Sequence, residues 1–162
     1  MPEDYTIEKW IWTEADFEVM GWHDNRIYAL AFSADTFELI LDIDYIFKWI
    51  NPEPGETFFQ FWTAPATLVF QNVYDVEFDI LTTTGLEIDS ITREQPRAPH
   101  NAAFIEQDVE WLWTINCQQG DIGLWSVGYQ QYVRSAPQFG PQQIGLSARG
   151  GYCFDKLSAK AN

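Results

Sequence analysis

The strongest constraint on the fold is a period-two alternation of apolar side chains between residues 37 and 49. One face would carry Phe37, Leu39, Leu41, Ile43, Tyr45, Phe47 and Trp49, and the other Glu38, Ile40, Asp42, Asp44, Ile46 and Lys48. Successive side chains of a strand point to opposite faces of a sheet, whereas a helix repeats about every 3.6 residues. The segment is therefore predicted to be one long strand, bent or bulged because of its length.

Shorter segments, some alternating and some apolar on both faces, predict a mainly β protein. Strands are expected over 26–32, 57–63, 66–70, 74–80, 86–91, 109–115 and 122–133. A break at Pro65 separates the second of these from the third, and a long loop is expected over 94–108. Thr13 and Asp16 have the spacing of a capping box at the start of a short helix. The chain is predicted to form a single β-rich domain, residues 1–162. Its fold would be an antiparallel sandwich or open barrel of about eight strands with one or two short helices.

The charge is concentrated in one part of the chain. The net charge is −15, and residues 1–90 contain eighteen acidic side chains but only three basic ones. Nucleic acid and anionic membranes are disfavoured as partners, because their binding surfaces need positive charge. A basic protein partner is favoured. Solubility alone is the alternative explanation.

The sequence gives no sign of a secretory signal or of a membrane-spanning segment. The N-terminus lacks the basic start and apolar stretch of a secretory signal, and no apolar run reaches the roughly 20 residues that span a bilayer. Cys117 and Cys153 follow no metal or redox spacing. A cytoplasmic location is expected.

No catalytic signature is found. His23 and His100 are the only histidines, and no Gly-x-Ser-x-Gly sequence presents a nucleophilic serine. There is no phosphate-binding glycine loop. We therefore expect a protein that is not an enzyme and has no cofactor and no catalytic residues.

Acidic side chains on the outer faces of strands are the candidate partner-binding residues. They are Asp42, Asp44, Asp75, Glu77 and Asp79. Asp42 and Asp44 would lie about 7 Å apart along one strand, a separation also found for glycosidase carboxylates. A solvated strand face explains the same residues, and a negatively charged face that meets a positive partner is the more economical function.

Trp22, His23 and Asp24 form the densest polar cluster beside an apolar segment. His23 and Asp24 could join Asp42 or Asp44 around a divalent ion. The preferred interpretation is a turn in which Asp24 accepts backbone hydrogen bonds. No metal is predicted, because a second histidine or a tighter ligand spacing is missing.

Tryptophans and two late arginines allow further interpretations. Trp10, Trp12, Trp49, Trp62, Trp111, Trp113 and Trp125 could line a ligand cavity or fill the core. Arg134 and Arg149 could bind an anionic ligand, but pairing with an acid from the first half of the chain is favoured.

Several motifs resemble a group of small uncharacterised bacterial proteins. They are Trp22-His23-Asp24-Asn25-Arg26-Ile27, residues 41–45, residues 65–73, residues 128–134 and Arg149-Gly150-Gly151. Proteins of this kind are similar to the immunity proteins encoded beside bacterial polymorphic toxins. The resemblance implies a cytoplasmic protein that binds and neutralises a toxin, and it assigns no binding residues.

Three functions follow as hypotheses. The leading one is an acidic protein-binding module, an immunity-type inhibitor of a basic toxin. The alternatives are a small-ligand-binding β-barrel protein with an aromatic cavity and a structural subunit of an assembly. The oligomeric state is not predicted.

Overall fold

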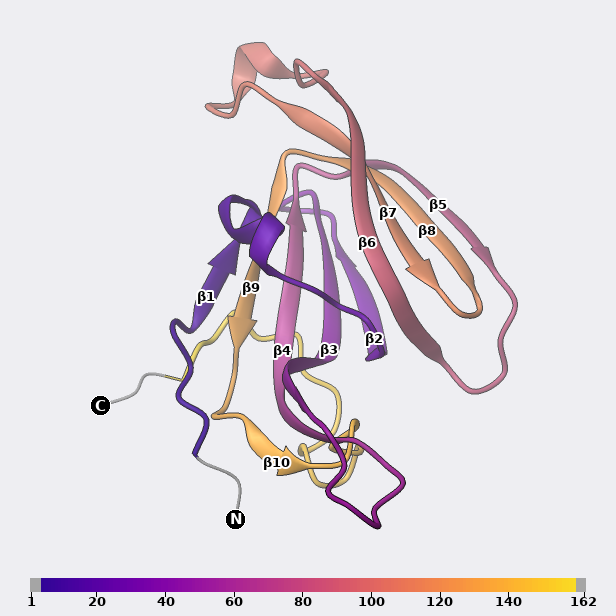
Figure 1. The fold of residues 1–162 in the computed structure, drawn as a ribbon. Coiled ribbons are helices and arrows are strands. Elements are labelled where there is room, and N and C mark those ends of the chain that lie inside the picture. The colour runs from indigo at the N-terminus through magenta and orange to yellow at the C-terminus, as the bar shows by residue number, and fades with distance from the viewer. Residues whose placement is uncertain (1–3, 160–162) are drawn as a thin grey trace.

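The computed structural model describes residues 4–159, which form one antiparallel sheet of ten strands (Figure 1). The strands are β1 (Ile11–Thr13), β2 (Asn25–Ser33), β3 (Glu38–Ile50), β4 (Gln60–Gln71), β5 (Tyr74–Ile80), β6 (Leu86–Arg97), β7 (Glu110–Cys117), β8 (Gly120–Ser126), β9 (Gly128–Val133) and β10 (Gln138–Gly140). The only helical elements described are two 3-10 turns, η1 (Glu14–Val19) and η2 (Ala102–Phe104). The prediction of a mainly β protein is confirmed. No helix among these residues has the length and apolarity needed to cross a membrane.

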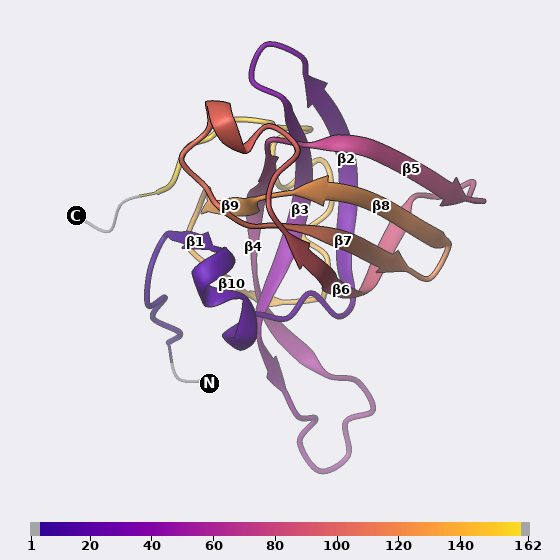
Figure 2. The ribbon, with the colours of Figure 1, turned by 90° about the horizontal axis from the view of Figure 1, so that it is seen from above.

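The sheet is open and folds back on itself. Its strand order is β1-β9-β4-β3-β2-β6-β7-β8-β5, and β10 pairs with β4. The group β6-β7-β8-β5 bends over the group β1-β9-β4-β3-β2, and this brings edge strand β5 beside β2 (Figure 2). The sheet is continuous, which differs from the two separate sheets of a sandwich, and it has more strands than the eight expected.

The hydrophobic core lies between the two groups of strands. Leu41 and Ile43 of β3, Phe70 of β4 and Trp113 of β7 are fully buried there. The rings of Trp113 and Phe70 pack edge-to-face, at a centroid distance of 5.5 Å. These side chains come from strands that are far apart in the sequence, so folding back the sheet creates the core.

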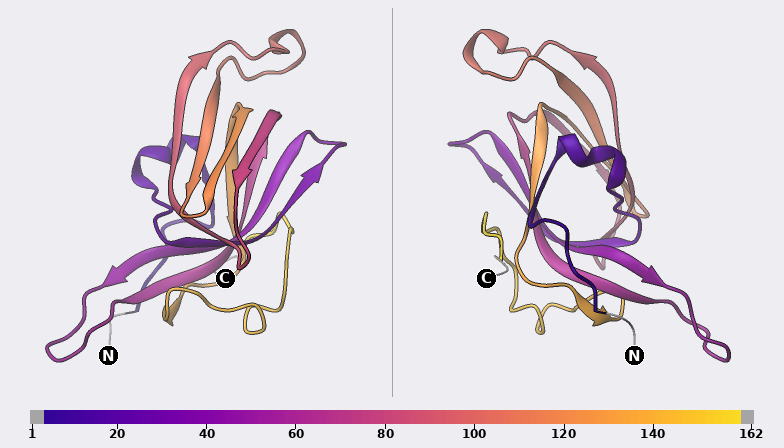
Figure 3. Two further views of the ribbon diagram at one scale, coloured as in Figure 1. Left: turned by 90° about the vertical axis from the view of Figure 1, so that its right-hand side faces the viewer. Right: turned by 60° about the vertical axis from the view of Figure 1, so that its left-hand side comes forward.

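Strand β3 has the alternation that the sequence predicts. Its inner face, with Leu39 to Tyr45 at odd positions, is buried in the core. The pairing of β3 with β4 shifts register between Ile46 and Lys48, which confirms the expected bulge. The β3–β4 hairpin projects beyond the rest of the sheet (Figure 3).

Strand β4 contains Pro65, which was expected to separate two strands. That expectation is wrong, because β4 runs without a break from Gln60 to Gln71. A proline lacks the N–H that a central strand donates. Pro65 lies where the neighbour of β4 changes: β10 pairs up to Thr63 and β9 begins at Ala66. Its carbonyl still accepts a hydrogen bond from the Arg134 N–H at 3.0 Å. The missing N–H therefore breaks no strand pairing.

The capping box predicted at Thr13 is present. The Thr13 side chain accepts from the Ala15 N–H, and the Asp16 carboxylate accepts from the Thr13 N–H at 2.9 Å. The element that follows is the 3-10 helix η1 of six residues. Strand 122–133 was expected as one unit, but the chain leaves β8 at Ser126 and enters β9 at Gly128.

The C-terminal segment after β10 packs on the outer face of β3 and β4. The Asp155 carbonyl accepts from the Thr67 hydroxyl at 2.8 Å, and the Cys153 N–H donates to Asp42 at 2.9 Å. Ile40, Asp42, Asp44 and Ile46 on that face are consequently buried. Both faces of β3 are covered, one by the core and the other by the C-terminal segment.

Candidate functional site

Three of the five predicted acidic residues lie on an exposed edge of the sheet. Asp75, Glu77 and Asp79 are exposed on β5, which ends the strand order. Within residues 4–159, none of the three joins an ion pair. The outer side of this edge therefore carries uncompensated negative charge.

A fourth acid adds to this charge across the strand pair β5–β8. The pairing places Asp79 directly opposite Asp121, and Glu77 opposite Gly123. Like charges directly opposite each other in a sheet are destabilising. Repulsion between Asp79 and Asp121 therefore destabilises the fold, and a cation bound at the surface would reduce this repulsion.

The acids surround a hollow on the surface of β5, β8 and β7. It has a volume of about 470 Å³ and is lined by Glu77, Phe78, Asp79, Thr114, Asp121 and Gly123. None of these residues is basic. A Cβ added to Gly123 would meet nothing within 4 Å, so the space above this glycine is open. We call these six residues the acidic hollow.

An apolar opening lies on the other side of β5, where the sheet does not close. Strand β2 pairs with β6 only from Asn25 to Ile27, and among residues 4–159 its later residues have no strand partner on that side. Phe32 of β2 is 59 % exposed and contacts Phe78 of β5 edge-to-face, at a centroid distance of 6.3 Å. A hollow of about 400 Å³ opens beside them, lined by Phe32, Ser33, Ala34, Phe37, Glu38, Val73, Tyr74 and Val76. We call this hollow the apolar seam.

Two residues at this edge have unusual backbone conformations. Phe37 has a φ of 56° and Asp75 has a φ of 50°, both in the left-handed region. Such conformations cost on the order of 1–3 kcal/mol and persist where surrounding contacts enforce them. The Val73 N–H donates to the Phe37 carbonyl at 2.8 Å and fixes the backbone there. Phe37 is thereby held at the rim of the apolar seam with 66 % of its surface exposed.

Asp42 and Asp44 were expected on an exposed acidic face, and this expectation is wrong. Both are completely buried beneath the C-terminal segment. Asp42 accepts hydrogen bonds from Arg134 and Arg149, each at 2.7 Å. Asp44 accepts from Arg149 at 3.2 Å. The favoured pairing of both arginines with acids of the first half is confirmed, and these carboxylates are not accessible to a partner.

Arg149 is the centre of this buried group. Its side chain is fully buried, donates to the Ile43 carbonyl at 2.9 Å, and lies 4.1 Å above the Tyr28 ring. Burial alone would lower the pKa of Arg149, but hydrogen bonding to Asp42 and the charges of Asp44 and Asp42 raise it above the ordinary value. Burial and the hydrogen bond to Asp44 raise the pKa of Tyr28 to about 12. The group is a fixed internal ion network that anchors the C-terminal segment.

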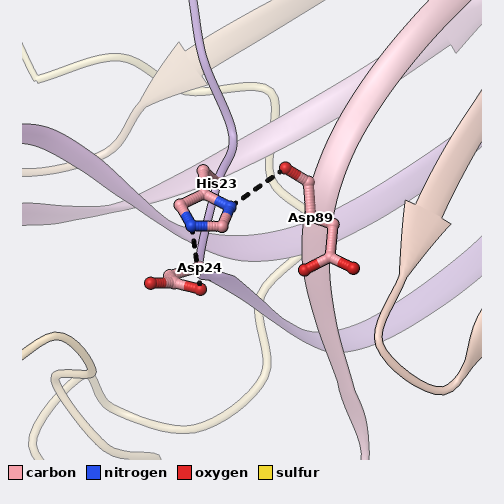
Figure 4. Close-up of side chains that lie close together, drawn as sticks. All are labelled: His23, Asp24 and Asp89. Atoms are coloured by element: carbon pink, nitrogen blue, oxygen red, sulfur yellow. Dashed lines mark hydrogen bonds and ion pairs between the residues drawn. The ribbon is translucent and has the colours of Figure 1, made fainter.

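His23 and Asp24 of the predicted polar cluster lie beside Asp89, a residue that the sequence pattern did not indicate. Trp22 is buried in the core, and its indole N–H donates to Gln131 at 2.9 Å. His23 Nδ1 lies 3.2 Å from the Asp89 carbonyl, and Nε2 lies 3.6 Å from the Asp24 carboxylate (Figure 4). Asp42 and Asp44, the expected companions of His23, belong instead to the Arg149 network.

A second charged group was not found from the sequence. Glu110 of β7 is buried and accepts from Tyr74, from Arg97 Nε at 2.9 Å, and from the His100 N–H at 3.0 Å. Burial opposes ionisation of Glu110, but these hydrogen bonds and the Arg97 charge hold its pKa below the ordinary value. The group anchors the loop between β6 and β7. No spacing in the sequence links its members, because they come from three separate segments.

Replacing Glu110 with glutamine should reduce the free energy of unfolding at pH 7 by about 1–3 kcal/mol, the range for hydrogen bonds to a buried charge. A lowered folded-state pKa stabilises the fold above the ordinary pKa of 4.5, and the contribution is lost as pH falls through the folded-state value. Urea unfolding at pH 7 and in steps below pH 4.5 measures this. The difference from wild type should shrink on acidification, and Glu106→Gln in the same loop should behave like wild type.

Comparisons with protein-family models, with curated proteins and with solved structures found no match for this chain.

Proposed function

We propose that this chain is a cytoplasmic protein-binding module whose β5 edge captures a basic partner. The observation that carries the proposal is the convergence of Glu77, Asp79 and Asp121 around the open space above Gly123. A lysine or arginine side chain of a partner fits this space by charge and would remove the repulsion between Asp79 and Asp121. The acidic hollow is thus the proposed point of contact.

The apolar seam supports a protein rather than a small cation as the partner. Phe32, Phe37 and Phe78 are exposed next to the acidic hollow, at 59 %, 66 % and 47 % of their surfaces. Aromatic side chains are enriched at the centres of protein interfaces, where charged residues surround them. The free edge of β5 also offers unpaired backbone groups to an added strand. A segment with alternating basic and apolar side chains would contact both surfaces.

More narrowly, we propose an immunity-type inhibitor of a basic toxin. Two lines of support are independent of the site geometry: the net charge of −15, and the resemblance of residues 22–27, 128–134 and 149–151 to proteins similar to toxin immunity proteins. An acidic surface accelerates capture of a basic target through long-range attraction. Rapid capture suits an inhibitor that must protect the cell in which its target is made.

Gly123→Arg separates this proposal from a surface that is only solubilising. The new guanidinium would occupy the acidic hollow, so the isolated chain should become more stable while partner binding weakens at least tenfold, about 1.4 kcal/mol. Removing a strand glycine contributes about 0.5–1 kcal/mol by itself. Gly123→Gln is the control for this backbone effect. The extra stability of Gly123→Arg over Gly123→Gln should decrease as salt is added.

The partner is identified with tagged wild-type protein in extracts of the native cell, at low and high salt. A basic protein that is retained at low salt, released at high salt and not retained by Gly123→Arg supports the proposal. Protection of cells that express this partner as a toxin then tests the immunity function. Equal retention by wild type and Gly123→Arg would show that the acidic hollow is not the binding site.

A further inference from the structure

His23, Asp24 and Asp89 meet where β2 first pairs with β6. Asn25 is paired with Ile88, and the Asp24 N–H donates to the Ile88 carbonyl at 2.8 Å. The register of the sheet therefore places Asp24 next to Asp89, although 64 residues separate them in the sequence. One ligand atom from each of the three side chains lies within 4.8 Å of the others.

The hydrogen bonding of His23 leaves its other ring nitrogen available to a cation. A backbone carbonyl can only accept, so Nδ1, at 3.2 Å from the Asp89 carbonyl, is the nitrogen that carries the proton. In a neutral ring, Nε2 then presents a lone pair to the Asp24 carboxylate at 3.6 Å. A cation between the Nε2 lone pair and the Asp24 carboxylate would be attracted by both acceptors. Histidines that bind metals usually donate their second N–H to a carbonyl or carboxylate in this way.

The His23 ring is held in this orientation by Trp49 on one side and borders a hollow on another. The Trp49 ring stacks on His23 at a centroid distance of 5.8 Å and an interplanar angle of 12°. His23 and Asp89 also border a hollow of about 310 Å³, whose lining includes Phe17 and Trp22. This hollow provides room for the water molecules that complete the coordination of an exposed metal ion.

From this geometry we propose that His23, Asp24 and Asp89 form a binding site for a divalent transition-metal ion, with Zn²⁺ as the best match. One imidazole and two carboxylates suit zinc and its neighbours, whereas calcium and magnesium prefer oxygen ligands alone. Ligand atoms of tetrahedral zinc lie about 3.3–3.6 Å apart, given bonds of about 2.0–2.2 Å. The exposed Asp89 carboxylate closes the remaining separation by a change of rotamer. The proposal is independent of the partner-binding function.

Isothermal titration of the full, untagged chain with ZnCl₂ tests the proposal. One Zn²⁺ should bind per chain, and His23→Gln should weaken that binding at least tenfold. The only other histidine provides a matched control, because His100→Gln should leave zinc binding within threefold of wild type. Asp89→Asn should also weaken binding, and titration with CaCl₂ should show much weaker binding than zinc.

Nitrogen-15 spectra of the two imidazoles provide a second measurement. Zinc should shift the Nε2 resonance of His23 and leave Nδ1 protonated, while the His100 resonances should not change. Absence of stoichiometric binding to the wild-type chain would overturn the proposal. Zinc binding that survives His23→Gln, or that His100→Gln removes, would overturn it as well. Far-ultraviolet circular dichroism of each variant shows that the fold is retained.

Discussion

Replacing Arg149 with methionine should lower the free energy of unfolding by about 3–5 kcal/mol, the loss expected when one partner of a buried ion pair is removed. The side chain is fully buried and donates to both Asp42 and Asp44. Methionine would fill much of the volume but leave Asp44 without a cation and Asp42 with Arg134 alone. Urea unfolding at pH 7, followed by tryptophan fluorescence, measures the effect.

Two further variants test the physical reason for this loss. Lys48→Met removes an exposed cation from β3, the strand that carries Asp42 and Asp44, and should change stability by less than about 0.5 kcal/mol. The triple variant Asp42→Asn, Asp44→Asn, Arg149→Met should be more stable than Arg149→Met alone, because it leaves fewer buried charges uncompensated. An Arg149→Met protein with the unfolding midpoint of wild type would show that the network does not anchor the C-terminal segment.

Replacing Trp113 with alanine should have an effect of similar size, about 3–5 kcal/mol, through loss of buried surface and creation of a cavity. Trp113 is completely buried between the two groups of strands and contacts the rings of Phe17, Phe70 and Tyr129. Its indole N–H donates to the Ser126 carbonyl at 3.0 Å. That hydrogen bond helps to hold β7 and the end of β8 together.

Trp113→Phe distinguishes the two contributions. Phenylalanine keeps most of the packing and loses the hydrogen bond, so its loss of stability should be clearly smaller than that of alanine. Phe58→Ala, at a side chain that is 80 % exposed, should be close to wild type. Equal thermal denaturation midpoints for Trp113→Ala and Phe58→Ala would contradict the central position of Trp113 in the core.

The placement of the arginines explains why β5 stays negatively charged. Arg97, Arg134 and Arg149 pair with carboxylates that are fully buried. Arg134 and Arg149 compensate Asp42 and Asp44 inside the protein, and the half-exposed Arg97 compensates Glu110. The exposed acids of β5 and Asp121 are left without them. The β5 edge is therefore more negative than it would be if the basic side chains were spread evenly over the surface.

Local patterns were sufficient for most strands and for the start of η1. The alternation over residues 37–49 predicted β3 and its bulge, and the acidic alternation over residues 74–80 predicted the exposed face of β5. Thr13 and Asp16 predicted the capping box. These features depend on residues within a few positions of one another, so a short segment of the sequence is enough to predict them.

Pro65 shows where local reasoning fails. A proline usually ends a strand because it cannot donate a hydrogen bond. Here the strand continues, since β10 ends and β9 begins on either side of the proline. Which strands become neighbours is decided by the folded sheet, and no short segment of the sequence contains that information.

The same distinction holds for the candidate sites. Asp42 and Asp75 each lie between two apolar residues of a segment in which polar and apolar side chains alternate. Asp42 is nevertheless buried against Arg149, whereas Asp75 is exposed. Likewise, Asp89 reaches His23 only through the pairing of β2 with β6.

The sequence by itself determined the β class, the period of the strands and the acidity of the chain. These follow from side-chain type and spacing along a strand. The tertiary structure decided which polar faces are covered, which arginines meet which acids, and where the sheet remains open. These depend on contacts between segments that are far apart in the sequence, such as Asp42 and Arg149 at a separation of 107 residues. Only the folding back of the sheet brings such segments together.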